Sequence, residues 1–301
     1  MRGSALATLA MDLFAGEPPA SLHPTVAMGR WISRGRARRR STIASAAFVE
    51  GLEVVGIGAV LSAGLAFATD RAIAWFPALL AVSIRAAALK PAIAVHALIE
   101  AARDVERALR DDDLARARRL LAWHLVSRDT SQLDSSDVAA AAIESLAENL
   151  NDAFVAPILA FRAAGLAGAY TFRFVNTADA MLGYRTPELE WFGKVAARSD
   201  DLLAFLPARC TAVFIAAAAG LVGACAYGAL TVVASDARRP ASPNAGWPMA
   251  AMAGALDVRL AKHNQYVLNA GARAPRASDI RRARHIVLVA AGLAALAVDF
   301  T

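Results

Sequence analysis

Residues 210–234 read CTAVFIAAAAGLVGACAYGALTVVA and contain no charged side chain over 25 positions. An α-helix rises about 1.5 Å per residue, so about 20 residues cross the ~30 Å hydrocarbon layer of a membrane. This stretch predicts a helix that crosses a membrane once, or one that bends back at Gly220–Gly223. The whole chain agrees with a membrane location, because 57% of its 301 residues are hydrophobic and only 19% are charged, against about 25% charged in an average soluble domain.

Four further apolar segments accompany this one, at residues 54–69, 72–89, 154–170 and 286–298. The first two predict a hairpin of helices that crosses the membrane and returns. The last two are either spans or buried or re-entrant helices. Hardly any stretch alternates with a period of two, so we expect almost no sheet. The sequence thus predicts an all-α, polytopic integral membrane protein, with residues 1–301 as a single membrane-embedded domain and a cytoplasmic-facing helical catalytic region.

Positive charge gathers at the ends of the apolar segments. The formal net charge is +6, and cytoplasmic loops of membrane proteins carry an excess of Lys and Arg. The arginines concerned are Arg30, Arg34, Arg36, Arg38, Arg39 and Arg40 before the first span, and Arg238, Arg239, Arg273, Arg276, Arg281, Arg282 and Arg284 after residue 234. We therefore expect a multi-pass protein of the inner (cell) membrane with both clusters, and the active site, on the cytoplasmic side. The composition argues against a nucleic-acid partner.

The segment AIESLAENLNDAFVAP, residues 142–157, has a carboxylate at every fourth position: Glu144, Glu148 and Asp152. On a helix these side chains share one face with a drift of about 80°, and Asn149 lies beside them. No basic residue occurs from Thr130 to Phe161, so ion pairs along the helix cannot neutralise the row. Oxygen ligands of this kind suit Mg²⁺. The alternative interpretation is an acidic face in contact with water.

Other polar residues fall at turns. Asp179, Asp200 and Asp201 are further candidate metal ligands, although Ser199 or Asp200 is also an ordinary N-cap for the start of a helix. The turn SPNAGWP at 242–248 offers Ser242 and Asn244 near exposed backbone N–H groups, which favours an anion. Arg128-Asp129-Thr130 is a similar turn. His23 is either structural or functional. No common nucleotide-binding motif occurs, so a nucleotide would bind at an unfamiliar kind of site.

Six motifs together make the chain recognisable. They are MDLFAGEPPASLHPTVAMGRWI, SRDTSQLD, AAIESLAENLNDAFVAPI, NTADAMLGYR, FGKVAARSDDLLAFLPAR and SPNAGWPMAAMAGALDVRL. Their order resembles the CobD/CbiB family, the adenosylcobinamide-phosphate synthases of cobalamin (vitamin B12) biosynthesis. The resemblance runs from Asp12 to about Tyr266. It departs from the family pattern at Glu17, Leu150-Asn151, Ala204 and Ala261-Lys262, the last standing where Gly-Gly is common.

The resemblance implies a membrane enzyme that joins adenosylcobyric acid to the amine of (R)-1-aminopropan-2-ol or its O-phosphate, with ATP as co-substrate and Mg²⁺. The lipid bilayer and other late cobalamin-pathway membrane enzymes are the further expected partners. The roles expected are Glu144, Glu148, Asn149, Asp152 and His23 in catalysis; Glu144, Glu148, Asp152, Asp179, Asp200 and Asp201 in metal binding; and Arg128, Asp129, Thr130, Asn176, Arg185, Arg209, Ser242 and Asn244 in binding substrate or phosphate. Two other functions stay open: a non-catalytic membrane sensor or regulator of the same superfamily, and a small-molecule transporter, since carboxylates inside a membrane often mark ion paths.

Overall fold

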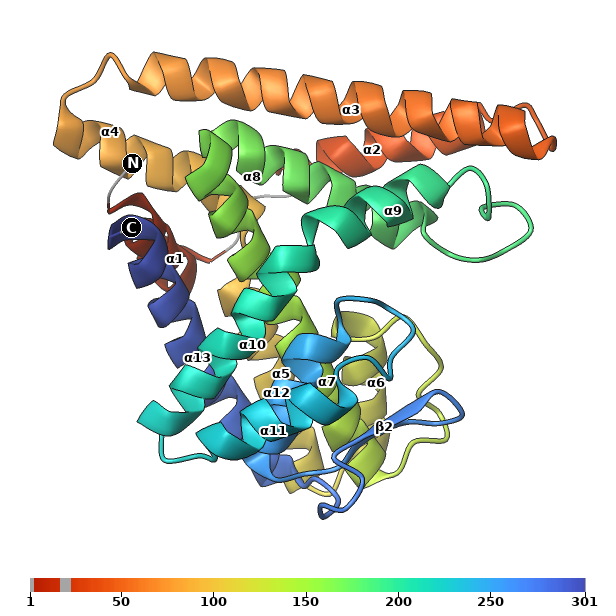
Figure 1. The fold of residues 1–301 in the computed structure, drawn as a ribbon, viewed down its shortest axis with the longest axis vertical. Coiled ribbons are helices and arrows are strands. Elements are labelled where there is room, and N and C mark those ends of the chain that lie inside the picture. The colour runs from red at the N-terminus through yellow and green to blue at the C-terminus, as the bar shows by residue number, and fades with distance from the viewer. Residues whose placement is uncertain (1–2, 17–22, 301) are drawn as a thin grey trace. The chain divides into compact units, whose positions relative to one another are not determined.

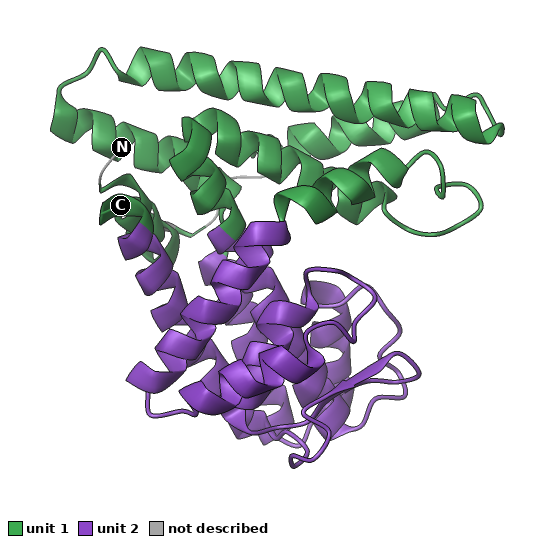
Figure 2. Ribbon diagram, viewed as in Figure 1, with its two compact units in different colours: residues 1–94, 156–204, 298–301 green, residues 95–155, 205–297 purple. Residues whose placement is uncertain are grey.

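The computed structural model describes residues 3–16 and 23–300, and helices dominate throughout (Figure 1). Within this part of the chain, sheet is confined to two short antiparallel strands, β1 (Leu260–Lys262) and β2 (Tyr266–Leu268). The prediction of an all-α protein is confirmed. The chain divides into two compact units, each assembled from segments far apart in sequence (Figure 2). Unit 1 comprises residues 1–94, 156–204 and 298–301, and unit 2 comprises residues 95–155 and 205–297.

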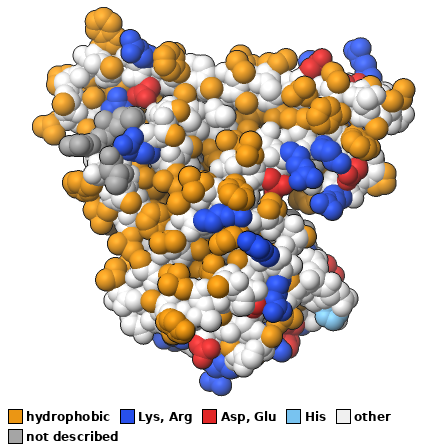
Figure 3. Space-filling view, viewed as in Figure 1, with side chains coloured by type: hydrophobic (Ala, Val, Ile, Leu, Met, Phe, Trp, Pro, Cys, Tyr) orange, Lys and Arg blue, Asp and Glu red, His pale blue; other side chains and the backbone are white. Residues whose placement is uncertain are grey.

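Unit 1 is built around the long helix α3. Its elements are α1 (Ser4–Ala15), α2 (Pro24–Ala37), α3 (Ala44–Ile73), α4 (Ala78–Leu89), the 3-10 turn η1 (Lys90–Ala92), α8 (Ala156–Leu182) and α9 (Lys194–Leu203). Helices α2, α8 and α9 pack against α3, and Phe174 and Phe192 are buried among them. The outer side of α3 exposes large apolar residues such as Val60 and Phe67. Hydrophobic side chains therefore cover much of this surface (Figure 3), as expected of a helix that faces lipid.

Unit 2 surrounds the central helix α7. Its elements are α5 (Val95–Arg110), α6 (Leu114–His124), α7 (Ser135–Leu150), the π-helical turn η2 (Asn151–Val155), α10 (Phe205–Leu221), α11 (Ala226–Asp236), α12 (Gly246–Leu256) and the two strands, together with most of α13 (Ala277–Phe300). Helix α7 contacts α5, α6, α12 and β1. Small residues permit close packing in this unit: a Cβ added at Gly254 would lie only 2.1 Å from the carbonyl oxygen of Gly228.

Several helices are long and apolar enough to cross a membrane. Three qualify by themselves: α3 with 30 residues, the 48-residue run Ser135–Leu182, and α13 with 24 residues. Two further pairs qualify only if each bent pair forms one span, namely Ala78–Ala92 with α5 and α9 with α10, both bent by 45°. Among the described residues this gives three to five candidate spans, and the chain is a multi-pass membrane protein.

The structure corrects two details of the expected spans. Residues 210–234 do not form one crossing helix, because α10 ends at Leu221 and α11 begins at Ala226. The alternative, a chain that bends back near Gly220–Gly223, is confirmed, since Gly223 has a φ of +73° and α10 packs against α11. The turn of the first hairpin lies at residues 74–77, where Pro77 precedes α4, rather than in the gap between the expected segments 54–69 and 72–89. The segments 154–170 and 286–298 lie in the Ser135–Leu182 run and in α13, both long enough to span.

Candidate functional site

Helix α7 carries two glutamates into the interior of unit 2. Asp134 caps its start by accepting a hydrogen bond from Asp137 N at 2.8 Å. Glu144 is buried and Glu148 is half-buried. The helix ends at Leu150 and gives way to η2.

The third carboxylate of the expected row, Asp152, lies in the turn η2. It is close enough to Glu148 for the two carboxylates to interact electrostatically. Asp152 Oδ1 also accepts a hydrogen bond from Asn151 Nδ2 at 2.7 Å. Thr211 Oγ1 donates to Asn151 Oδ1 at 3.1 Å, which ties the turn to α10. Asp152 therefore lies next to Glu148, although it does not line the cavity described below.

A polar cavity of about 250 Å³ opens onto the two glutamates, and we call it the glutamate cavity. It is lined by Leu125, Val126, Ser127, Arg128, Ala141, Glu144, Ser145, Glu148, Lys262 and Tyr266. All of these residues belong to unit 2. The loop before α7, the buried face of α7 and the β1–β2 hairpin therefore meet at one site.

Positive groups face the carboxylates in this cavity. Arg128 Nη2 lies 3.9 Å from Glu144 Oε2, and Lys262 is close enough to act electrostatically on both glutamates. Glu144 Oε1 is nevertheless buried with no hydrogen-bond partner in the part of the chain that the structure describes. A buried carboxylate oxygen without a partner is unfavourable. It suits a site that receives a cation or a donor from a ligand.

Tyr266 completes the cavity from strand β2. Its hydroxyl lies 3.7 Å from Met249 Sδ and interacts with the Glu144 carboxylate. Burial, followed by the negative charge of Glu144, raises the pKa of Tyr266 well above its usual range. The phenol is therefore a neutral hydrogen-bond donor at physiological pH.

The loop that presents Arg128 is held in place from both sides. Ser145 Oγ donates to Leu125 O at 2.9 Å, and Asn149 Nδ2 donates to Ser145 Oγ at 3.0 Å. Thr130 Oγ1 donates to Arg118 O at 3.0 Å. The exposed Asp129 carboxylate accepts hydrogen bonds from Ser131 N and Oγ, and these lower its pKa. In the structure, Asn149, Thr130 and Asp129 thus form hydrogen bonds that hold the loop before α7 in its conformation.

The turn at residues 242–248 lies in unit 2 and is held by internal hydrogen bonds. Ser242 Oγ accepts hydrogen bonds from Asn244 N at 3.3 Å and Ala245 N at 3.2 Å. Arg209 donates to Asn244 Oδ1 at 2.6 Å and to Pro243 O at 3.1 Å. Its guanidinium carbon lies 4.4 Å from the centre of the Trp247 ring. The structure brings together Arg209, Ser242 and Asn244, which do not line the glutamate cavity.

The other predicted site residues lie in unit 1: His23, Asn176, Asp179, Arg185, Asp200 and Asp201. Asn176 Nδ2 donates to Asp200 Oδ1 at 3.3 Å, and Arg198 Nη1 lies 3.8 Å from Asp201 Oδ2. The interpretation of Ser199 or Asp200 as an N-cap is wrong, because both residues lie inside α9, whose N-cap is Gly193. His23 Nδ1 accepts a hydrogen bond from Thr25 N at 3.3 Å and caps α2.

The arrangement of side chains bears on divalent metal binding. Across residues 3–16 and 23–300, no three His, Cys, Asp or Glu side chains are grouped so that they could hold a metal ion. Mg²⁺, however, is commonly bound by only one or two carboxylates together with substrate phosphates and water. Glu144 and Glu148 form such a pair, and the unpartnered Glu144 oxygen fits it.

Sequence patterns missed the two functional side chains that the hairpin contributes to the cavity wall. Lys262 and Tyr266 come from the hairpin, more than 100 positions after α7. One signal was present for Lys262, since Ala261-Lys262 replaces a pair that is commonly Gly-Gly in the family that the chain resembles. Asn151 and Thr211 were also missed as partners, because their contact joins residues 60 positions apart.

Comparison with known proteins places these observations in a family. The family model described as "CobD/Cbib protein" matches residues 5–287, which include parts of both units. The "Cobalamin biosynthesis protein CobD" of Rhodobacter capsulatus is 39% identical over 295 residues, covering 91% of this chain and 88% of its own. The "Probable cobalamin biosynthesis protein CobD" of Methanothermobacter thermautotrophicus is 37% identical over 263 residues, covering 87% and 85% respectively. No solved structure matches. The chain therefore belongs to the CobD/CbiB family.

Proposed function

We propose that the chain acts in cobalamin biosynthesis as an ATP- and Mg²⁺-dependent amide ligase. Its substrates would be adenosylcobyric acid and (R)-1-aminopropan-2-ol or its O-phosphate, and its product adenosylcobinamide or adenosylcobinamide phosphate. The family and the names of its relatives support the pathway. The observation that carries the reaction class is the glutamate cavity, where two carboxylates and two cationic side chains meet inside an apolar helical unit.

The reaction needs a leaving group on the substrate carboxylate. In the proposed sequence a carboxylate oxygen of adenosylcobyric acid attacks the γ-phosphorus of ATP, and ADP leaves. The amine then attacks the acyl carbon, inorganic phosphate leaves, and the nitrogen loses a proton. Charge develops on phosphoryl oxygens in both steps, and cationic groups stabilise such charge best where water is excluded.

The residues of the cavity suit these roles. Glu144 and Glu148 would hold Mg²⁺, which supplies neutralisation of phosphate charge when bound. Arg128 and Lys262 would bind phosphate oxygens, and Arg128 offers the planar fork that matches them. The neutral Tyr266 hydroxyl would donate a hydrogen bond. The turn held by Arg209 would bind a second anionic group, either a phosphate or a carboxylate of the corrinoid side chains.

The substitution Glu148→Gln tests the proposal. It keeps the shape of the side chain and removes one ligand charge, so ligation should fall by at least about 100-fold, in the range of losses seen when a charge-stabilising group is removed from an active site. The purified full chain in lipid nanodiscs would be incubated with adenosylcobyric acid, aminopropanol phosphate and Mg²⁺-ATP, and the amide product measured by mass spectrometry. Parallel reactions with free aminopropanol, and with EDTA, identify the amine and the metal requirement.

Glu100→Gln is the matched control, because Glu100 pairs with Arg103 on α5 and does not line the cavity. It should leave turnover unchanged. Near-normal turnover of Glu148→Gln would refute the assigned role of the carboxylate pair. Absence of product with the unaltered chain under all conditions would refute the ligase and favour the sensor or transporter.

A further inference from the structure

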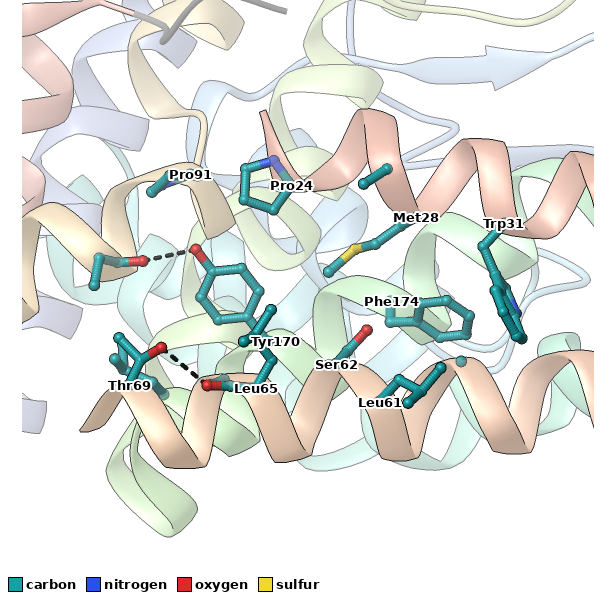
Figure 4. Close-up of a pocket in the computed structure, with 15 residues that line it drawn as sticks. Pro24, Met28, Trp31, Leu61, Ser62, Leu65, Thr69, Pro91, Tyr170 and Phe174 are labelled. Carbon is teal, nitrogen blue, oxygen red and sulfur yellow. Dashed lines mark hydrogen bonds between the residues drawn. The ribbon is translucent and has the colours of Figure 1, made fainter. Parts of the chain in front are cut away.

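Unit 1 contains two neighbouring cavities of opposite chemical character between α2 and α3. The first, which we call the apolar cavity, has a volume of about 500 Å³. Figure 4 shows Pro24, Met28 and Trp31 of α2 facing Leu61 and Leu65 of α3, with Tyr170 and Phe174 of α8 between them. The volume lies in the range of small-molecule sites. The cavity is therefore large enough for a ligand of substantial size.

Most polar groups around the apolar cavity are already satisfied by the protein. The Tyr170 hydroxyl donates to Ala88 O at 2.7 Å, Thr69 Oγ1 donates to Leu65 O at 2.9 Å, and Trp31 Nε1 donates to Val54 O at 2.9 Å. What the cavity presents to a ligand is thus almost entirely hydrocarbon. A polar metabolite would lose its hydration there without new hydrogen bonds, whereas an alkyl chain would not.

The second, which we call the basic cavity, has a volume of about 530 Å³ and is lined by Arg34, Arg38, Arg39 and Arg40. Two glutamates, Glu50 and Glu53, also line it, so positive charge prevails. Arg40 N donates to Glu50 Oε2 at 3.2 Å. Arg39 donates to the carbonyl oxygens of Ser41 and Glu188.

Two of these arginines are available to a ligand. The side chains of Arg34 and Arg38 are exposed, and within the described residues neither forms an ion pair or a side-chain hydrogen bond. They are the groups best placed to receive an anion.

Trp31 lines both cavities and forms the boundary between them. Along α3 the basic cavity is lined by residues from Glu50 to Ile57, and the apolar cavity by residues from Gly58 to Thr69. The apolar cavity therefore coincides with the uncharged part of the candidate membrane span α3, and the basic cavity with its N-terminal part, which carries Glu50 and Glu53. Tryptophan and arginine are enriched at that depth, where lipid headgroups lie.

We propose that this pair of cavities binds an anionic phospholipid. The phosphate lies at Arg34 and Arg38, and one acyl chain passes Trp31 into the apolar cavity. The positive charge of the basic cavity and its place at one end of a candidate membrane span favour this occupant. Basic pockets between membrane helices on the cytoplasmic side bind anionic headgroups. A free phosphate would leave the apolar cavity unused, and a neutral lipid would leave the two arginines unused.

Native mass spectrometry of the delipidated full chain in detergent tests the proposal. The chain would be titrated with dioleoyl phosphatidylglycerol, with dioleoyl phosphatidylcholine, and with glycerol 3-phosphate, which carries the phosphate but no acyl chain. We expect one phosphatidylglycerol to bind more tightly than phosphatidylcholine, and no competition from glycerol 3-phosphate. The double variant Arg34→Gln/Arg38→Gln should weaken phosphatidylglycerol binding by about fivefold for each arginine removed and abolish the preference.

Two matched controls separate this site from general adsorption. Arg30→Gln/Arg198→Gln removes the same charge from exposed positions that line neither cavity and should preserve the preference. Ser62→Phe fills the apolar cavity and should weaken binding of both lipids, whereas Val60→Phe, at an exposed position outside it, should not. The proposal would be overturned if either variant bound the lipids as its control does. It would also be overturned if the unaltered chain bound the two lipids equally, or if glycerol 3-phosphate displaced phosphatidylglycerol.

Discussion

At the scale of single residues, Arg209 shows how one side chain can organise a loop. Besides its bonds to the turn at residues 242–248, it donates to Phe205 O at 2.7 Å and stacks on the Phe205 ring at 3.7 Å. A guanidinium forms several hydrogen bonds in one plane while its faces contact aromatic rings, and an ammonium cannot reproduce this arrangement. Charge is therefore only part of what Arg209 contributes.

We expect Arg209→Lys to lower the free energy of unfolding by about 1–3 kcal/mol, the range for lost hydrogen bonds to a charged group. Thermal unfolding in detergent would measure the change. Arg107→Lys, at an exposed position on α5, is the control and should have little effect. If both variants had the same melting temperature, the stability of the turn would not depend on the guanidinium.

Site residues could be predicted from the sequence where their positions follow from the geometry of a single helix. Glu144 and Glu148 stand four apart in a segment without basic residues, and both line the glutamate cavity. The role of Arg128 in binding phosphate stays a prediction, and the structure places its guanidinium opposite Glu144. Lys262 and Tyr266 could not be placed, because only the folding of a distant hairpin brings them to α7.

At the scale of elements, helix α8 bends at Ala164 and Gly165. Gly165 has a φ of +60° and a ψ of −153°, a conformation that side-chain-bearing residues rarely adopt. Leu166 N donates to Asp70 Oδ2 at 3.4 Å, and Arg85 Nε donates to Asp70 Oδ1 at 2.7 Å. An ion pair thus packs beneath the bend, and a Cβ added at Gly165 would lie 2.4 Å from Asp70 Oδ2.

The substitution Gly165→Ala should therefore destabilise unit 1 by about 1–3 kcal/mol, the usual cost of a strained backbone conformation. Gly64→Ala on α3 provides the comparison, since an added Cβ there meets no atom within 4 Å. Thermal unfolding of both variants would be followed by circular dichroism. Equal melting temperatures would mean that the bend tolerates a side chain.

Most helices could be predicted from the sequence, but the positions at which the apolar segments break could not. Residues 210–234 are equally apolar on both sides of the break, so composition does not locate it. The break depends on tertiary contacts: Cys225 N donates to Ala255 O at 3.0 Å, and α11 packs closely on α12 at Gly228 and Gly254. The end of α7 at Leu150 is similar, because η2 is stabilised by Thr211 from another helix.

At the scale of the whole molecule, distant parts of the chain build each unit. Asp299 is buried near the C-terminus, and its carboxylate accepts hydrogen bonds from Ala5 N at 3.1 Å and Leu6 N at 2.9 Å. Helix α1 has no capping side chain at its own N-cap, Gly3. Asp299 therefore satisfies the first backbone donors of a helix from almost 300 residues away. Sequence patterns could not predict this, because caps are ordinarily supplied by neighbouring residues.

We expect Asp299→Ala to lower the free energy of unfolding by about 0.5–2 kcal/mol, as for the loss of a helix cap. Asp111→Ala, at an exposed position after α5, should leave stability unchanged. Hydrogen exchange followed by mass spectrometry would show whether the change is concentrated in α1. Uniformly faster exchange, or none, would contradict the capping role.

The capping of α1 by Asp299 also bears on how the protein is made. The ribosome releases α1 long before the carboxylate that caps it, because almost 300 residues separate the two. Until residue 299 has been made, the amide groups at the start of α1 must be satisfied by water, lipid headgroups or the insertion machinery. Nascent chains that stop short of residue 299 would therefore carry this helix without its cap.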